Sequence, residues 1–407
     1  GVPQVMMAVA TQGSRIRSRV GFVKALASAL CIGTGGSVGR EGPIVQIGSS
    51  LASSVGQRMR LPEGRLRLIV ACGAAGGIAA TFNAPLMGAF FGFELILRLF
   101  SIDAFCALLV SALAADVIDQ QFFGQAPFFG GFPQLGVQHL VEYALVAVLG
   151  VLSGLIGIGF KTVLYKVQDL CDLPFRGRLA WARPAIGGVA LGALLFFLPQ
   201  MYGVGYTVVG EVFSDPGRFA LWLVVAMMAG KVLGASITLG NGGSGGVFGP
   251  SVFTGAMAGV AFGLLVRALF GPIAGEPVLY GMVAMGAVVA SAAQAPLTAA
   301  ASVVEMTGDF ALTLPAILAA AIAAAVSKSL SYGTIYTTKL LRRGIDVEED
   351  LPGPVVVRAR RRDATPGTAS RPPRFRNARP GTSAPGGETA GRKPQGHKPK
   401  GHRAKGR

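Results

Sequence analysis

The sequence has few charged residues and few of the residues from which metal or catalytic sites are built. Of its 407 residues only 14% are charged, and it contains three histidines and four cysteines. A soluble domain carries about 25% charged residues, so the composition excludes an ordinary soluble enzyme. The cysteines form no CxxC pair, His139 stands alone, and His397 and His402 lie in the basic tail. We therefore expect no catalytic residue, no cofactor and no metal ion.

Apolar segments fill most of the chain, which is 51% hydrophobic and contains 59 glycines. The segments are 68–97, 104–118, 141–165, 185–200, 219–239, 251–270, 277–304 and 311–330. A membrane span needs roughly 20 apolar residues, and several of these segments are shorter or contain Gly and Pro. Short and broken segments are typical of helices buried in protein rather than facing lipid. The sequence predicts an all-α, multi-pass protein of the cell membrane, embedded in the lipid bilayer.

Much of the net charge of +17 lies in the last part of the chain, between Arg358 and Arg407. This part is rich in Pro, Gly, Ser and Thr and almost free of apolar residues, which is typical of disorder. Basic segments remain on the cytoplasmic side of a membrane protein and are attracted to anionic lipid. We expect a cytoplasmic C-terminus and, because aromatic residues are not interleaved with the charges, no nucleic-acid partner.

Two stretches of the chain have the same pattern. Residues 24–43 read KALASALCIGTGGSVGREGP, and residues 231–250 read KVLGASITLGNGGSGGVFGP. Each is an apolar run that breaks into a glycine-rich turn and restarts as a second apolar run. In a membrane protein, helices interrupted at matching positions in two halves indicate a binding site near the midplane. The restarted helices would direct unpaired backbone N–H groups and positive dipole ends toward an anion.

The repeat continues beyond this pattern. The sequence APL occurs at residues 84–86 and again at 295–297, and each is followed by one glutamate in an apolar helix, Glu94 and Glu305. Two such halves usually have inverted topology about a pseudo-two-fold axis in the membrane plane, although sequence alone leaves parallel repeats open. We predict a first transmembrane repeat over 1–119, an extramembrane loop over 120–140, a second repeat over 141–345 and a disordered basic tail over 346–407.

Glu41 is the strongest candidate for a functional side chain. It lies at a predicted helix start between glycines, inside an otherwise apolar region. Ionisable residues at membrane depth are costly and mark ion or proton pathways, and a helix N-terminus favours a carboxylate. Such a carboxylate would occupy the anion site when charged and leave it when protonated. The alternative interpretation is a glutamate that only stabilises the first turn of its helix.

Three motifs resemble those of the CLC family of chloride channels and chloride/proton antiporters. They are GTGGSVGREGP at 33–43, GGVFGP at 245–250 and YTTKLLRRGI at 336–345. The resemblance implies a CLC-like fold, usually a homodimer, with Glu41 as the external gate and Tyr336 donating its hydroxyl to an inner chloride. It implies anion binding by Gly39, Arg40, Glu41, Gly42, Val247, Phe248 and Tyr336. The alternative role of Tyr336 is that of an aromatic residue at the membrane interface, and Tyr332 is a weaker candidate.

Two departures from the family pattern affect the functional prediction. The chain begins Gly1-Val2-Pro3, which resembles the end of the family's first selectivity motif, so we expect the family's anion-coordinating serine and the first helices to precede it. The second departure is Leu95, which stands where many antiporters carry an internal proton-transfer glutamate, next to the retained Glu94. Leucine cannot carry a proton, so the usual internal proton transfer is absent. We expect the neighbouring Glu94 to be structural and hydrogen bonded inside the protein.

The sequence therefore predicts a transporter of chloride or a similar small anion through a pore gated by Glu41. Because Leu95 removes the usual proton relay, we expect a passive, voltage- or pH-sensitive channel. The first alternative is a chloride/proton antiporter whose internal protons reach Glu41 through water. An intramembrane enzyme is a weaker alternative, because no Ser/His or Asp/Asp pair is evident at membrane depth.

Overall fold

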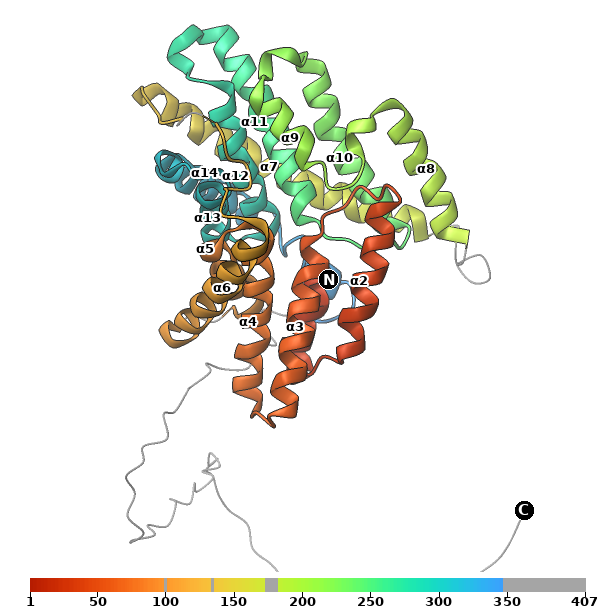
Figure 1. Ribbon diagram of the computed structural model, residues 1–407. Coiled ribbons are helices and arrows are strands. Elements are labelled where there is room, and N and C mark those ends of the chain that lie inside the picture. The colour runs from red at the N-terminus through yellow and green to blue at the C-terminus, as the bar shows by residue number, and fades with distance from the viewer. Residues whose placement is uncertain (99–100, 133–134, 173–181, 347–407) are drawn as a thin grey trace, which may run out of the picture. The chain divides into compact units, whose positions relative to one another are not determined.

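The computed structural model describes residues 1–98, 101–132, 135–172 and 182–346, which form helices joined by turns (Figure 1). The predicted tail over 346–407 lies outside the described residues, except for Asp346. The all-α prediction is confirmed. The longer helices are α1 (Val2–Thr11), α2 (Ser18–Gly33), α3 (Glu41–Arg58), α4 (Glu63–Phe82), α5 (Pro85–Phe91), α6 (Ile102–Phe123), α7 (Leu140–Asp172), α8 (Arg183–Phe197), α9 (Tyr206–Ser214), α10 (Leu221–Gly240), α11 (Phe248–Phe270), α12 (Pro277–Ala293), α13 (Pro296–Thr307) and α14 (Thr313–Leu330).

Five helical stretches among the described residues are long and apolar enough to cross a membrane. They are Glu63–Phe82, Leu140–Asp172, Leu221–Gly240, Phe248–Ala274 and Phe310–Leu330. Among the shorter apolar helices, α12 is wholly buried, whereas α8 is largely exposed. The burial of α12 agrees with the expectation that broken segments are satisfied inside the protein.

Each predicted glycine-rich turn breaks a helix at the same point of its repeat. In the first repeat α2 ends at Gly33 and α3 begins at Glu41, whereas in the second α10 ends at Gly240 and α11 begins at Phe248. Gly35 and Gly242 occupy matching positions and have φ values of 104° and 89°. Glycine adopts these angles readily because it has no Cβ, and the chain can therefore reverse direction within a few residues. Figure 1 shows α3 between α2, which precedes the first of these turns, and α4.

The two turns pair with each other through their backbones. The Gly39 N–H donates to the Gly246 carbonyl at 2.9 Å, and the Gly246 N–H donates to the Gly39 carbonyl at 2.7 Å. Equivalent residues that exchange both bonds in an antiparallel bridge are related by a local two-fold axis. A Cβ added to Gly246 would lie 2.6 Å from the Gly42 nitrogen, so the approach requires glycine. This pairing supports the inverted arrangement of the repeats.

The two APL turns also match. The apolar segments 68–97 and 277–304 are each divided, at Asn83 and at Gln294, which have φ and ψ of 53° and 48° and of 53° and 43°. These left-handed residues end α4 and α12, and the Ala-Pro that follows starts a new helix. Proline occupies the first helical position of α5 and of α13. The N–H groups that follow it have no intrahelical acceptor and can bond to other groups.

Each repeat supplies the acceptor for the other repeat's helix. Glu94, in the π-helical turn Gly92–Leu97, accepts bonds from the Leu297 and Thr298 N–H groups at 3.0 and 2.8 Å and from the Thr298 hydroxyl at 2.7 Å. Glu305 on α13 accepts bonds from the Leu86 and Met87 N–H groups at 2.9 and 2.7 Å. The expectation that Glu94 is hydrogen bonded within the protein is confirmed. Its bonds fasten the two repeats together at a second point.

We predict that Glu94→Gln and Glu305→Gln each lower the stability of the protein. A glutamine turns an amide N–H₂ toward helix N–H groups that need an acceptor, and bonds to charged groups contribute about 1.5–3 kcal/mol each. The midpoint of thermal unfolding in detergent should fall for both variants. Glu211→Gln, which changes an exposed carboxylate on α9, is the control and should leave the midpoint unchanged. Wild-type midpoints in both repeat variants would contradict the capping role.

Candidate anion site

The starts of α3 and α11 meet where the two glycine-rich turns pair. Glu41 opens α3 and Phe248 opens α11, with Arg40 and Val247 as their N-cap residues. The first N–H groups of a helix have no intrahelical acceptor, and the positive end of the helix dipole lies there. The predicted residues of both turns, namely Gly39, Arg40, Glu41, Gly42, Val247 and Phe248, therefore lie together around one point of convergence.

The carboxyl group of Glu41 lies at this point and is 1% exposed. Its Oε2 accepts a bond from the Gly249 N–H of the other repeat at 3.2 Å. Its Oε1 accepts a bond from the Tyr206 hydroxyl at 2.6 Å. A side-chain carboxylate thus occupies the kind of position in which a helix N-terminus binds an anion.

Glycines make the room that this carboxyl group occupies. A Cβ added to Gly39 would lie 1.9 Å from Glu41 Oε2, and one added to Gly249 would lie 3.1 Å from Glu41 Oε1. Real Cβ atoms do not approach another atom as closely as the 1.9 Å found for Gly39. The pocket around the carboxyl group therefore depends on the absence of side chains at both positions.

A cavity of about 200 Å³ lies on one side of Glu41; we call it the Tyr336 cavity. Gly42 and Val247 line it from the two helix starts, and Tyr336 lines it from the loop before the short helix α15 (Thr338–Leu341). Tyr336 therefore lies with the helix starts, as expected, whereas the exposed Tyr332 turns away and donates to Asp346 at 2.6 Å.

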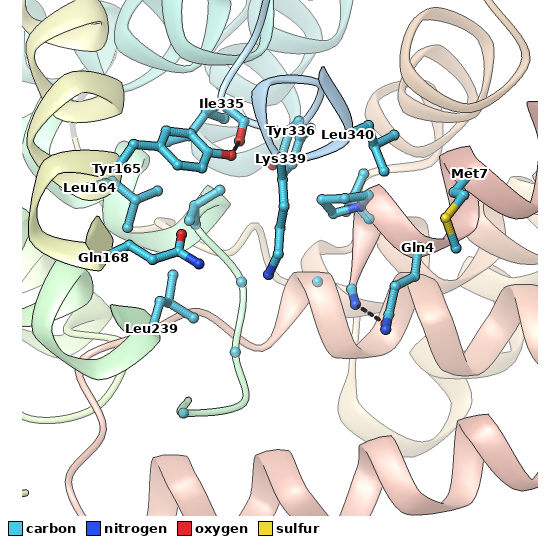
Figure 2. A pocket seen from close by; sticks show the side chains of 18 of the residues that line it. Gln4, Met7, Leu164, Tyr165, Gln168, Leu239, Ile335, Tyr336, Lys339 and Leu340 are labelled. Atoms are coloured by element: carbon cyan, nitrogen blue, oxygen red, sulfur yellow. Dashed lines mark hydrogen bonds between the residues drawn. The ribbon is translucent and has the colours of Figure 1, made fainter. Parts of the chain in front are cut away.

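The Tyr336 cavity is positively charged. Its lining includes Lys24, Lys339 and Arg343 and contains no Asp or Glu. Figure 2 shows Lys339 extending between Gln168 and Gln4. Burial, followed by repulsion from Arg343, lowers the pKa of Lys339 from its ordinary value of 10.5. Cations that share their described lining with no acidic side chain attract small anions toward the helix starts.

A second hollow, of about 520 Å³, involves Arg40, Phe128, Gly205 and Tyr206; we call it the Tyr206 groove. The Arg40 guanidinium lies 5.8 Å from the centre of the Phe128 ring and donates to the Thr81 carbonyl at 3.2 Å. Glu41 thus has one chain neighbour, Arg40, in the groove and the other, Gly42, in the Tyr336 cavity.

Three residues in or beside the two hollows were not predicted as site residues. Tyr206 contacts the carboxyl group directly, Lys231 is completely buried behind the Tyr206 groove, and Lys24 donates to the Ser244 hydroxyl at 2.9 Å. Lys24 and Lys231 match in the repeat, and lysines in apolar runs are a signal that could have singled them out. No pattern in the sequence connects Tyr206 with Glu41.

The chain is similar to known anion transporters. Residues 1–328 match the voltage gated chloride channel family. The chain is 34% identical over 353 residues to a putative chloride channel protein ClcB-like from Ralstonia nicotianae, covering 85% of this chain and 80% of that protein. It is 31% identical over 331 residues to an H(+)/Cl(−) exchange transporter ClcA from Vibrio cholerae, covering 79% and 70%.

Solved structures are similar as well. A slow cyanobacterial Cl⁻/H⁺ antiporter aligns with a TM-score of 0.75 and 27% identity, covering 84% of this chain and 80% of that one. A CLC-type fluoride/proton antiporter aligns with a TM-score of 0.70 and 25% identity, covering 82% of both chains. The predicted polytopic fold is thus found in proteins that transport anions.

We predict that Gly39→Ala displaces the Glu41 carboxyl group, because the new methyl group would overlap Oε2. Chloride efflux from liposomes should rise at neutral pH, and its dependence on pH should flatten. Gly33→Ala is the matched control, because a Cβ there meets no atom within 4 Å. Unchanged pH dependence in Gly39→Ala would contradict the glycine-made pocket.

Proposed function

Because this chain belongs to the voltage gated chloride channel family, whose members move anions and are not enzymes, we propose that it exchanges chloride for protons across the membrane. The observation that carries the proposal is the buried carboxyl group of Glu41, which occupies the convergence of two helix N-termini. An anion and this carboxylate compete for one position, whereas a proton neutralises the carboxylate and releases it. Family membership rules out the intramembrane enzyme.

The relatives favour exchange over the passive channel that Leu95 predicts. The Vibrio cholerae relative and two similar solved structures are named as exchangers or antiporters, whereas the Ralstonia nicotianae relative is named a putative channel. Leu95 is buried in the hydrophobic core and carries no proton. Exchange therefore needs a proton route that avoids position 95.

The Tyr336 cavity supports such a route. A volume of about 200 Å³ holds several water molecules, and its wall contains polar groups of Gln4, Gln168 and Tyr336 that can bind them. The cavity reaches Gly42, the residue next to Glu41. In our proposal water, rather than a second glutamate, brings protons from this side to Glu41.

The site residues take the following roles in this proposal. Glu41 is the gate and the proton carrier, and Tyr336 binds the anion in the cavity through a neutral hydroxyl, which holds an ion without trapping it. The backbone N–H groups around Gly39, Arg40, Gly42, Val247 and Phe248 provide the remaining donors. The Tyr336 side faces the cytoplasm and the Tyr206 side faces outward. The homodimer and the cytoplasmic C-terminus stay predictions of the sequence.

We predict that a chloride gradient drives uphill proton movement in liposomes that contain the wild-type protein. After chloride has passed, the protonated Glu41 carboxyl group must release its proton before it can return to the anion position as a carboxylate. Movement of chloride is therefore coupled to movement of a proton. Reversal potentials under opposed chloride and proton gradients measure the coupling. A potential set by chloride alone would contradict exchange and restore the passive channel.

We predict that Glu41→Ala abolishes proton movement and pH-dependent gating while chloride flux persists or rises. The variant lacks both the proton carrier and the carboxylate that competes with chloride. Chloride efflux and proton uptake should be recorded separately between about pH 4 and pH 8, a range that spans carboxyl titration. Glu211→Ala, on the exposed side of α9, is the control. Wild-type pH dependence in Glu41→Ala would contradict the gate assignment.

A further inference from the structure

The hydroxyl group of Tyr206 donates a hydrogen bond to the Glu41 carboxyl group, and the proposed function assigns no role to this bond. The starts of α3 and α11 surround the carboxyl group of Glu41, but Tyr206 approaches it from the start of α9. We propose that Tyr206 is an outer latch, whose hydroxyl retains the Glu41 carboxylate in the anion position, and that Lys231 positions this hydroxyl. The inference rests on the proposed gating role of Glu41.

The bond itself favours the charged gate. At 2.6 Å the Tyr206 hydroxyl donates to Glu41 Oε1, and the separation is in the range of charge-assisted O–H···O⁻ bonds. The Gly249 N–H, at 3.2 Å, is the longer of the two bonds. Because the Tyr206 hydroxyl donates more strongly to a carboxylate than to a carboxylic acid, the latch opposes protonation and release of the gate.

Aromatic packing fixes the ring that carries this hydroxyl. The Tyr206 ring centre lies 4.8 Å from that of Phe128, 5.9 Å from Phe129 and 6.1 Å from Phe82, each in an edge-to-face arrangement. Such pairs have a preferred geometry and restrict ring motion. Phe128 and Phe129 come from the segment 120–140, whose described residues between Gly124 and His139 are non-helical. This segment therefore contacts the latch.

A buried lysine supports the turn that leads into Tyr206. Lys231 on α10 is 0% exposed, and its ammonium donates to the Gly203 carbonyl at 2.7 Å and lies 5.2 Å from the Phe253 ring centre. Gly203 and Gly205 have φ values of 58° and 90°. A Cβ on Gly205 would lie 2.9 Å from Phe253 Cδ2. The turn that precedes Tyr206 is thus packed tightly against Lys231 and Phe253.

Several charged or titratable groups face Glu41, and each belongs to a different element. Arg40 is on its own helix, Tyr206 on α9, Lys231 on α10 and Tyr336 on the loop before α15. Arg40 and Lys231 both favour the carboxylate through their charge. Lys231 can therefore act on Glu41 directly as well as through the turn, and the test must separate these two routes.

The first test is Tyr206→Phe, which keeps the ring packing and removes only the hydroxyl. Loss of a bond to a charged group should move the midpoint of pH-activated chloride efflux up by about one pH unit and increase efflux at neutral pH. Tyr202→Phe is the matched control, because its hydroxyl donates to the Gly33 carbonyl instead. A midpoint within error of wild type, or one that moves down, would overturn the latch.

The second test concerns Lys231. Lys231→Met should reproduce the upward shift, and Lys231→Arg, which keeps a donor for the Gly203 carbonyl, should restore the wild-type midpoint. If Lys231 acts through the hydroxyl, Lys231→Met should add little to the shift of Tyr206→Phe in the double variant. Full additivity, or a failure of arginine to restore the midpoint, would overturn the positioning role of Lys231.

These outcomes differ from those that test exchange. Chloride efflux reports the latch whether or not protons are coupled to it, and reversal potentials report coupling whether or not Tyr206 acts as a latch. In a Glu41→Gln background, Tyr206→Phe should change nothing, because no charged gate remains. An effect of Tyr206→Phe in that background would assign the hydroxyl to another role and overturn the proposal.

Discussion

The pairing of Gly39 with Gly246 is the constraint on which the arrangement of the site depends. Two backbone segments that exchange bonds at 2.9 and 2.7 Å hold the starts of α3 and α11 at one point. Side chains at Gly42 or Gly246 would separate them, because a Cβ on either would lie within 3.0 Å of the opposite backbone. Two helix dipoles can therefore act on the same anion position, and a carboxyl group from one helix can fill it.

Three glutamates accept bonds at the starts of helices that match between the repeats, and their partners differ. Glu94 and Glu305 accept bonds from the first N–H groups of α13 and α5, so each holds one repeat to the other. Glu41 accepts one backbone bond and one from the Tyr206 hydroxyl. Neither Glu94 nor Glu305 lines the Tyr336 cavity or the Tyr206 groove, whereas Glu41 has a chain neighbour in each of them. A carboxyl group that accepts N–H bonds at a helix start thus stabilises the contact between the repeats at Glu94 and Glu305. At Glu41 it is the movable gate of our proposal.

Because position 95 is leucine, proton exchange requires that protons reach Glu41 through the Tyr336 cavity in our proposal. Its cations attract chloride but repel protons, so water and neutral side chains must provide the path in our proposal. Anion and proton would then use one entrance and separate only at the last residue, Glu41.

The sequence by itself determined the helical membrane class, the two repeats, the broken helices and Glu41 as the gate candidate, because glycine spacing and apolar length are local properties. The resemblance to the family also led to the prediction that Glu94 is hydrogen bonded inside the protein. Only the tertiary structure decided that Glu94 and Glu305 cap opposite repeats and that Tyr206, backed by Lys231, reaches Glu41. These contacts join residues more than 150 positions apart, and no periodicity records which distant helix start will meet a given side chain.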